Sequence, residues 1–304
     1  MPHVTFIHGI ANKPPAGALH DLWLRGLSLG GLNLPGQGVT STMVYWADVL
    51  HAAPRDPFAP TDESLSETEL GEGTHGPEIP HEFDSAEERA FVEGLAAKLA
   101  LADDEDAPAF VPADPALERI PIPWLLKQRM MRVLLRDAHH YLFDAEHEPR
   151  PGTRYRVQTE IRRRTLDALQ SAPASGPHVV VAHSLGSVIA YDVLQRVADA
   201  PAIDALLTLG SPLGIDEVQD RLQPGWTRAD GFPTRTVRTR WVNVFDPIDL
   251  VCLLDPRLSN DFRRDGAAVV EDLSVTNAGS WRHSYEKYAG QPALTARLAD
   301  LLRD

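Results

Sequence analysis

A serine flanked by small residues lies between an apolar strand and a helix. The run His178–Val181 predicts a buried strand, Ser187–Val197 predicts a helix, and only five residues join them. At such a sharp turn the two backbones nearly touch, so small residues are required two positions on either side of the serine. Ala182 and Gly186 occupy those positions, which predicts a nucleophile elbow with the hydroxyl of Ser184 at its apex.

An acid and a histidine must follow such a serine in that order. The predicted strand Arg240–Phe245 ends at two aspartates, Asp246 and Asp249, and an acid in this position lies at the carboxyl edge of the sheet. We favour Asp249 as the partner of the histidine, in which case Asp246 caps or braces the turn. The alternative assigns the acid to Asp246.

The same order selects the histidine, because His283 is the one histidine after both aspartates. A serine hydroxyl is a poor nucleophile until a neutral imidazole takes its proton. A carboxylate must then hold the ring in the right tautomer and stabilise the imidazolium. The predicted catalytic residues are therefore Ser184, His283 and Asp249.

A loop near the N-terminus supplies the rest of such a site. A short predicted strand runs into His8-Gly9-Ile10, where the glycine lets the backbone turn toward the serine. We predict that the oxyanion hole consists of the N–H groups of Ile10 and of Leu185, the residue after the serine. The neighbouring histidines, His8 and His183, are predicted to brace their loops.

On these residues the chain resembles the α/β-hydrolases. The match comprises His8-Gly9-Ile10, residues 182–186, Asp249 and His283, although Ala182 stands where the common pattern has glycine. Residues 183–192, 208–214 and 246–249 also resemble lipase-like proteins related to DDHD-domain phospholipases and GPI-inositol deacylases. The resemblance implies an ester hydrolase of the esterase or lipase type that works through an acyl-enzyme. It does not identify the acyl chain.

The same triad serves other activities. A thioesterase, an amidase or peptidase, and an acyltransferase remain alternatives within enzymes. A hydrolase-fold protein that binds a ligand without turnover is the alternative outside them.

The net charge, the cysteine content and the apolar runs of the chain restrict its possible binding partners and its location. The net charge of −14 weighs against nucleic acid and against an anionic membrane surface. The single cysteine, Cys252, allows no internal disulfide, and its apolar neighbours predict a buried, inert thiol. The first strand starts by about His3, which leaves no room for a signal peptide, and no apolar run approaches the ~18 residues of a membrane span. We therefore expect a cytoplasmic enzyme that acts on a small-molecule or lipid ester.

The alternation of predicted strands and helices divides the chain into a core and an insertion. Residues 1–50 and 151–304 are the predicted hydrolase core, with a mostly parallel sheet flanked by helices, and residues 51–150 are a predicted cap or lid insertion. The oxyanion strand comes first, so the sheet is expected to lack the two antiparallel strands that often precede it. The predicted core strands are Val4–Ile7, Thr42–Ala47, His178–Val181, Ile203–Leu209, Arg240–Phe245 and Ala267–Val275, and the helices are Leu19–Leu27, Gln158–Leu169, Ser187–Val197 and Ala293–Leu302.

The insertion opens with an acidic, proline-rich segment, Pro54–Pro80, that predicts a loop. Helix Ala86–Leu101 follows, with capping-box spacing between Ser85 and Glu88. The apolar helix Trp124–Phe143 forms a flexible cap wall that accepts an acyl chain, packs between cap and core, or does both with different faces.

Three clusters of basic residues are expected to lie on the surface and not to bind a ligand. We expect Arg129, Arg132 and Arg136 to form a solvated face rather than an anion site, and the arginines at positions 162–164 to be exposed. The histidines at positions 139, 140 and 147 lack the spacing of a metal site. No cofactor or metal is predicted.

Overall fold

A six-stranded parallel sheet forms the centre of the protein. The computed structural model describes residues 1–56, 83–99, 124–222, 227–252, 254–279 and 281–303, with the backbone alone for 124–129. The strand order is β10-β7-β6-β5-β1-β2, and every pairing is parallel. The strands are β1 (His3–Ile7), β2 (Thr40–Val44), β5 (His178–His183), β6 (Ile203–Leu209), β7 (Val237–Phe245) and β10 (Val270–Ser274).

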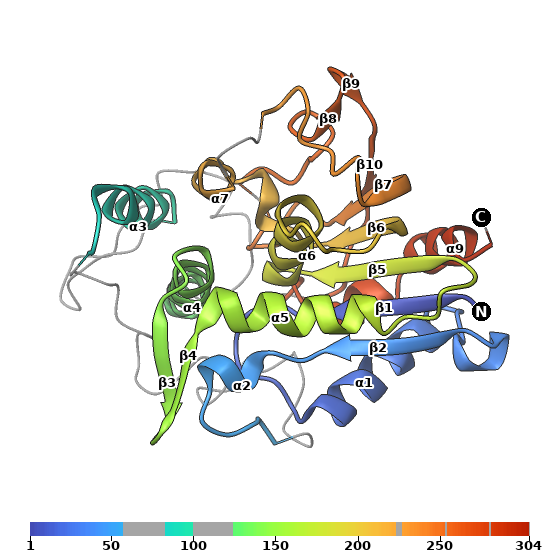
Figure 1. The fold of residues 1–304 in the computed structure, drawn as a ribbon, viewed down its shortest axis with the longest axis horizontal. Helices are drawn as coiled ribbons and strands as arrows, with labels where there is room; N and C mark the ends of the chain where they lie inside the picture. The colour runs from blue at the N-terminus through green and yellow to red at the C-terminus, as the bar shows by residue number, and fades with distance from the viewer. Residues whose placement is uncertain (57–82, 100–123, 223–226, 253, 280, 304) are drawn as a thin grey trace.

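Helices cover both faces of this sheet (Figure 1). One face carries α1 (Ala16–Leu29), α8 (Tyr285–Ala289) and α9 (Pro292–Leu301), and the other carries α4 (Trp124–Leu142), α5 (Val157–Gln170) and α6 (Leu185–Arg196). Successive side chains of a strand point to opposite faces, so Val179 and Val181 join one apolar cluster and Val180 joins the other. Burial on both faces explains the continuous apolar sequence of β5. The predicted parallel sheet flanked by helices is confirmed.

The strand order has a switch point at one place in the sheet. β1 has β2 on one side and β5 on the other, so the chain reverses its direction of travel between β1 and β5. Open parallel sheets bind their ligands beyond the carboxyl ends of the strands at such a point. Gly9 and Ile10 follow β1, and Ser184 follows β5, so the topology brings these two loops together.

Two predicted strands differ in the structure. β2 ends at Val44, and the short helix α2 (Ala47–Leu50) follows it where the strand was expected to continue. The predicted strand Ala267–Val275 is split, because β9 (Ala267–Ala268) pairs antiparallel with β8 (Arg263–Arg264) and only β10 enters the main sheet. Asp265 and Gly266 between β8 and β9 have φ of 50° and 74°, the left-handed pair that a tight hairpin turn requires.

The described parts of the predicted insertion pack on the core. α3 (Ala86–Lys98) begins at Ser85, whose hydroxyl accepts the N–H of Glu88 at 3.1 Å, as the capping box predicts. An antiparallel hairpin that the sequence did not reveal, β3 (Glu146–Arg150) and β4 (Thr153–Arg156), leads into α5. Most of the predicted loop Pro54–Pro80, and the end of the first predicted insertion helix, lie outside the described residues. The division into core and cap stays a prediction.

Helix α4 is buried along most of its described length. Met131, Leu134 and Tyr141 belong to the same apolar cluster as the sheet residues beneath them, while Met130 lines a cavity described below. The helix therefore both packs against the core and contributes to a cavity wall.

The prediction that the three arginines of α5 are exposed was wrong for two of them. Arg163 lies on the surface, but Arg162 forms a bidentate ion pair with the fully buried Asp192 of α6, at 2.6 and 2.7 Å. Arg164 pairs with Asp48. Helical periodicity turns consecutive side chains to different faces, so three adjacent arginines cannot share one environment.

The remaining short elements complete the described chain. They are α7 (Asp216–Arg221) and the 3₁₀ turns Pro35–Gln37 and Pro212–Gly214. Among the helices that the structure describes, none has both the length and the apolar composition needed to cross a bilayer.

Candidate active site

Ser184 occupies the elbow between β5 and α6 in a strained conformation. Its φ of 56° and ψ of −132° lie where residues other than glycine are rarely found. The surrounding bonds hold it there: its N–H donates to the carbonyl of Leu209 at 2.9 Å, and its own carbonyl accepts the N–H and the hydroxyl of Ser187 at 2.9 and 2.6 Å. Such strain is found at functional sites, where the surrounding structure compensates for it.

Two glycines permit the close packing around the elbow. A Cβ on Gly186 would lie 2.4 Å from the carbonyl oxygen of Ile7, at the end of β1. A Cβ on Gly9 would lie 2.4 Å from the Cβ of Ser184. The two loops at the switch point therefore fit together only because both positions lack a side chain.

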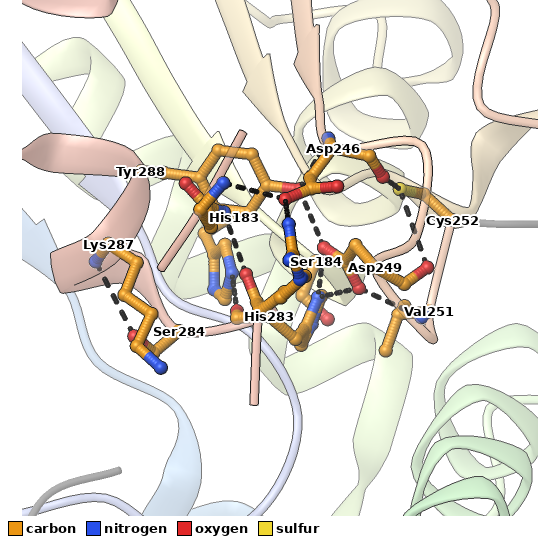
Figure 2. Close-up of polar contacts among 12 residues, drawn as sticks. His183, Ser184, Asp246, Asp249, Val251, Cys252, His283, Ser284, Lys287 and Tyr288 are labelled. Atoms are coloured by element: carbon orange, nitrogen blue, oxygen red, sulfur yellow. Dashed lines mark hydrogen bonds and ion pairs between the residues drawn. The ribbon is translucent and has the colours of Figure 1, made fainter. Parts of the chain in front are cut away.

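His283 and Asp249 are hydrogen-bonded to each other (Figure 2). Nδ1 of His283 lies 2.9 and 2.8 Å from the two carboxylate oxygens of Asp249. A carboxylate only accepts, so Nδ1 carries a proton, and in the neutral form of the ring the lone pair is on Nε2. Nε2 of His283 and Oγ of Ser184 are both buried without a partner among the described residues, and both residues line one cavity.

Tyr288 and Val251 complete the surroundings of Asp249. The hydroxyl of Tyr288 donates to Oδ2 at 2.6 Å, and the N–H of Val251 donates to Oδ1 at 2.9 Å. Burial raises the pKa of the Asp249 carboxyl, but His283 and these two donors outweigh burial and hold that pKa below its ordinary value. Sequence reasoning missed Tyr288, which no motif marks and which reaches Asp249 only through the fold.

Asp246 has a different set of partners. Its carboxylate accepts the N–H groups of Ile248 and Asn277 at 3.0 and 2.7 Å and forms an ion pair with Arg282 at 3.0 Å. Asp246 thus ties its own turn to the segment that leads into His283. Of the two aspartates, Asp249 is the one bonded to the histidine.

The two predicted oxyanion donors belong to the loop after β1 and to the start of α6. Ile10 lines the same cavity as Ser184, and Leu185 is the first residue of α6. No hydrogen bond found within the described residues uses either backbone N–H. The first N–H groups of a helix lack intrahelical acceptors and favour negative charge, which suits an anion at this place.

His8 and His183 support the loops around the serine. Nε2 of His8 accepts the N–H of Trp46 and Nδ1 donates to the carbonyl of Gly9, both at 2.9 Å. Nε2 of His183 donates to the carbonyl of His283 at 2.6 Å. Burial lowers the pKa of His8 to about 3 and that of His183 well below its ordinary value, so both rings stay neutral.

These buried neutral histidines predict that the fold loses stability in mild acid. Burial lowers the pKa of His8 to about 3 and those of His51, His140 and His178 to about 4. The unfolded chain takes up these protons below pH ~6.5, so each histidine lowers the free energy of unfolding by up to about 1.4 kcal/mol per pH unit until its folded pKa is reached. The free energy of unfolding therefore carries no penalty from these histidines above pH ~6.5, and it falls progressively as the pH is lowered toward ~4.

Urea unfolding at pH 7.5 and pH 5 measures this loss. His178→Gln removes one contributor and should show a smaller difference between the two midpoints than the wild type. Equal wild-type midpoints at the two pH values would contradict the prediction.

A cavity of about 110 Å³ opens beside Ser184 and His283. Its apolar lining includes Leu19, Leu22, Trp23, Met130, Trp281 and Tyr285. The rings of Trp23 and Tyr285 stack with their centroids 3.5 Å apart. Lys13, Arg55 and Glu286 bring charge to the same cavity.

The histidines of the insertion each have a protein partner. Nε2 of His139 lies 2.6 Å from the Glu88 carboxylate, His140 bonds the carbonyl of Arg136, and His147 bonds that of Leu50. Cys252 is fully buried, as predicted, and burial raises the pKa of its thiol well above the ordinary value.

Comparison with known proteins finds similar solved structures but no similar sequence. No protein-family model and no curated protein sequence matches the chain. An esterase domain from Rhodothermus marinus matches with 16% identity over 47% of this chain and 67% of its own, at a TM-score of 0.30. Est1E from Butyrivibrio proteoclasticus, solved with ferulic acid, matches with 10% identity over 100% of this chain and 90% of its own, at a TM-score of 0.40.

The class of fold follows from the topology of this chain. An all-parallel sheet with helices on both faces, and a strained serine elbow at the switch point between β1 and β5, define the α/β-hydrolase fold.

Proposed function

We propose that the protein hydrolyses carboxylic esters through an acyl-enzyme on Ser184. The observation that carries this proposal is the shared cavity of Ser184 and His283, with the Nδ1 of that histidine bonded to Asp249 at 2.8–2.9 Å. Neither the hydroxyl of Ser184 nor the Nε2 of His283 has a hydrogen-bond partner among the described residues, so both are available to a substrate.

In the proposed reaction, Oγ of Ser184 attacks the ester carbonyl carbon while Nε2 of His283 takes the hydroxyl proton. The carbonyl π pair moves to oxygen, and the N–H groups of Ile10 and Leu185 stabilise that oxyanion. The intermediate collapses to the acyl-enzyme, and the leaving alcohol takes the proton from Nε2. A water molecule activated by the same nitrogen then releases the acid and restores Ser184.

Asp249 holds the ring throughout this cycle. Its carboxylate keeps the proton on Nδ1 in the resting state and stabilises the imidazolium when Nε2 is also protonated. The hydroxyl of Tyr288, at 2.6 Å, fixes the carboxylate in turn.

The size of the cavity indicates the acyl group. Its volume of about 110 Å³ is well below the ~300–1,000 Å³ of sites for drug-sized ligands, and its lining combines apolar side chains with charged ones. We therefore expect short acyl groups to react faster than long ones. Hydrolysis of p-nitrophenyl esters from acetate to palmitate tests this, and an optimum at palmitate would contradict it.

Fluorophosphonate labelling tests the proposal directly. The folded wild-type protein should be labelled on one tryptic peptide, and the modified residue should be Ser184. A folded protein that refuses the probe would leave the non-catalytic binding alternative as the better account. Parallel assays with matched thioesters and amides then rank the leaving groups that the triad accepts.

A further inference from the structure

The loop that carries Ile10 is held by two side chains of opposite charge. Nζ of Lys13 donates to the carbonyl of Ile10 at 2.6 Å, and Oδ2 of Asp137 accepts the N–H of Ala11 at 2.9 Å. These two backbone groups are opposite ends of one peptide unit, Ile10–Ala11. That unit is therefore held at its carbonyl by a cation and at its N–H by an anion.

Asp137 is a rigid and ionised anchor. It lies on α4, 126 residues from Ala11 in sequence, and its side chain is fully buried. Its second oxygen accepts two hydrogen bonds from Arg136, at 2.8 and 2.7 Å. Burial raises the pKa of the Asp137 carboxyl, but Arg136, His51 and the N–H of Ala11 outweigh burial and hold that pKa below its ordinary value.

The loop needs such anchors because its backbone is strained. Ala11 has a φ of 67°, in the left-handed region that favours glycine. Without a bond to its N–H, the Ile10–Ala11 peptide would rotate toward a more ordinary conformation. Hydrogen bonds to a charged partner are stronger than neutral ones, so the two ions oppose that rotation effectively.

The preceding peptide unit is held from the other side. Nδ1 of His8 donates to the carbonyl of Gly9 at 2.9 Å, and the N–H of Ile10 belongs to this same unit. In a trans peptide the N–H points away from the carbonyl, so the N–H of Ile10 is directed away from His8. Fixing the units on both sides of the Ile10 Cα therefore fixes the direction of this N–H.

We propose that Asp137 and Lys13 are positioning residues of the oxyanion hole, which act by clamping the Ile10–Ala11 peptide so that the N–H of Ile10 stays directed at the reacting oxygen. The proposal rests on the proposed function, in which that N–H is an oxyanion donor. Asp137 does not line the described cavity, so its effect on the reaction passes through the loop. It connects the predicted insertion to the catalytic chemistry by a single carboxylate.

Asp137→Ala is the first test, measured by steady-state kinetics on p-nitrophenyl acetate. Loss of one oxyanion donor costs about a hundredfold or more in kcat, and a donor that is only misdirected should cost about tenfold or more. KM and the pH dependence of kcat/KM should stay close to wild type, because the side chain removed by Asp137→Ala neither lines the described cavity nor bonds His283. Deuterium exchange of the peptide that spans residues 8–14 should become faster, whether or not the protein turns over substrate.

Two further variants separate positioning from loss of structure. Asp137→Asn keeps an oxygen that can accept from Ala11, so it should restore slow exchange and part of kcat. Asp192→Asn is the matched control, because Asp192 is also fully buried and bonded twice to an arginine but lies outside the loop. It should lower the melting temperature while leaving kcat and the exchange of residues 8–14 close to wild type.

The outcomes distinguish the two proposals. In the first outcome the wild type is labelled and active, and Asp137→Ala shows faster exchange of residues 8–14 but an unchanged kcat. This result would overturn the positioning role and leave the proposed function standing. A fall in kcat for Asp192→Asn equal to that for Asp137→Ala would also overturn it. A folded wild type that is neither labelled nor active would overturn the proposed function, and the positioning role with it.

Discussion

Ser184→Ala is expected to lower kcat for ester hydrolysis by at least about four orders of magnitude. The nucleophilic oxygen is removed, and no covalent acyl-enzyme can form at this position. On the proposed function, the two oxyanion N–H donors and the cavity remain and leave a residual acceleration of about 10³–10⁴-fold over water. Fluorophosphonate labelling should disappear together with turnover.

The fold should survive this substitution. Oγ of Ser184 makes no hydrogen bond within the described residues, so its removal leaves no partner unsatisfied, and the melting temperature should stay within a few degrees of wild type. Ser211→Ala is the matched control, because Ser211 is also a buried serine, but its hydroxyl bonds Ser187 and the N–H of Leu213. This control should keep most of the activity. Activity of Ser184→Ala within about a hundredfold of wild type would mean that another group is the nucleophile.

Asp249→Asn is expected to lower kcat by about four orders of magnitude, whereas Asp246→Asn should cost less than about tenfold. An asparagine at position 249 can turn its amide N–H toward Nδ1, which moves the imidazole proton to Nε2. The ring then cannot accept the proton of Ser184. The geometry of the site changes little, so the loss appears in kcat and not in the melting temperature.

The substitution at position 246 disturbs a different set of bonds. In the wild type Oδ1 of Asp246 accepts the N–H of Ile248, and Oδ2 accepts the N–H of Asn277 and pairs with Arg282 at 3.0 Å. Asn keeps an acceptor for one of these two sets and loses the other, together with the charge opposite Arg282. Its effect should fall on stability. Steady-state kinetics and thermal unfolding of both variants measure the difference, and a larger kinetic loss for Asp246→Asn would transfer the role of the acid to that residue.

Local patterns predicted the parts of this protein that local chemistry determines. The apolar run of β5 and the small residues around Ser184 each depend on a few neighbouring positions, and the predicted parallel sheet is confirmed. The order of acid and histidine after the serine needs only their positions along the chain. The hairpin of β8 and β9 was missed because an apolar run was read as one strand, although Asp265 and Gly266 form the turn.

Contacts between distant segments could not be predicted in this way. Tyr288 meets Asp249 and Asp137 meets Ala11 only because the sheet and α4 bring them together. Arg162 looked like a surface residue because its neighbours in sequence are charged, yet the buried carboxylate of Asp192 lies against it. The identity of a polar residue indicates what it can bond, and the fold alone determines what it does bond.

Helix α4 carries two residues that contact different parts of the candidate active site. Met130 lines the cavity beside Ser184, and Asp137, about two turns further along, accepts the N–H of Ala11, next to the proposed oxyanion donor Ile10. On the proposed reaction, a substitution that refits Met130 to a larger acyl group and shifts α4 along its axis also shifts Asp137. Acyl preference and turnover rate are therefore mutationally coupled, and directed evolution of one should select compensating changes in the loop at Ala11.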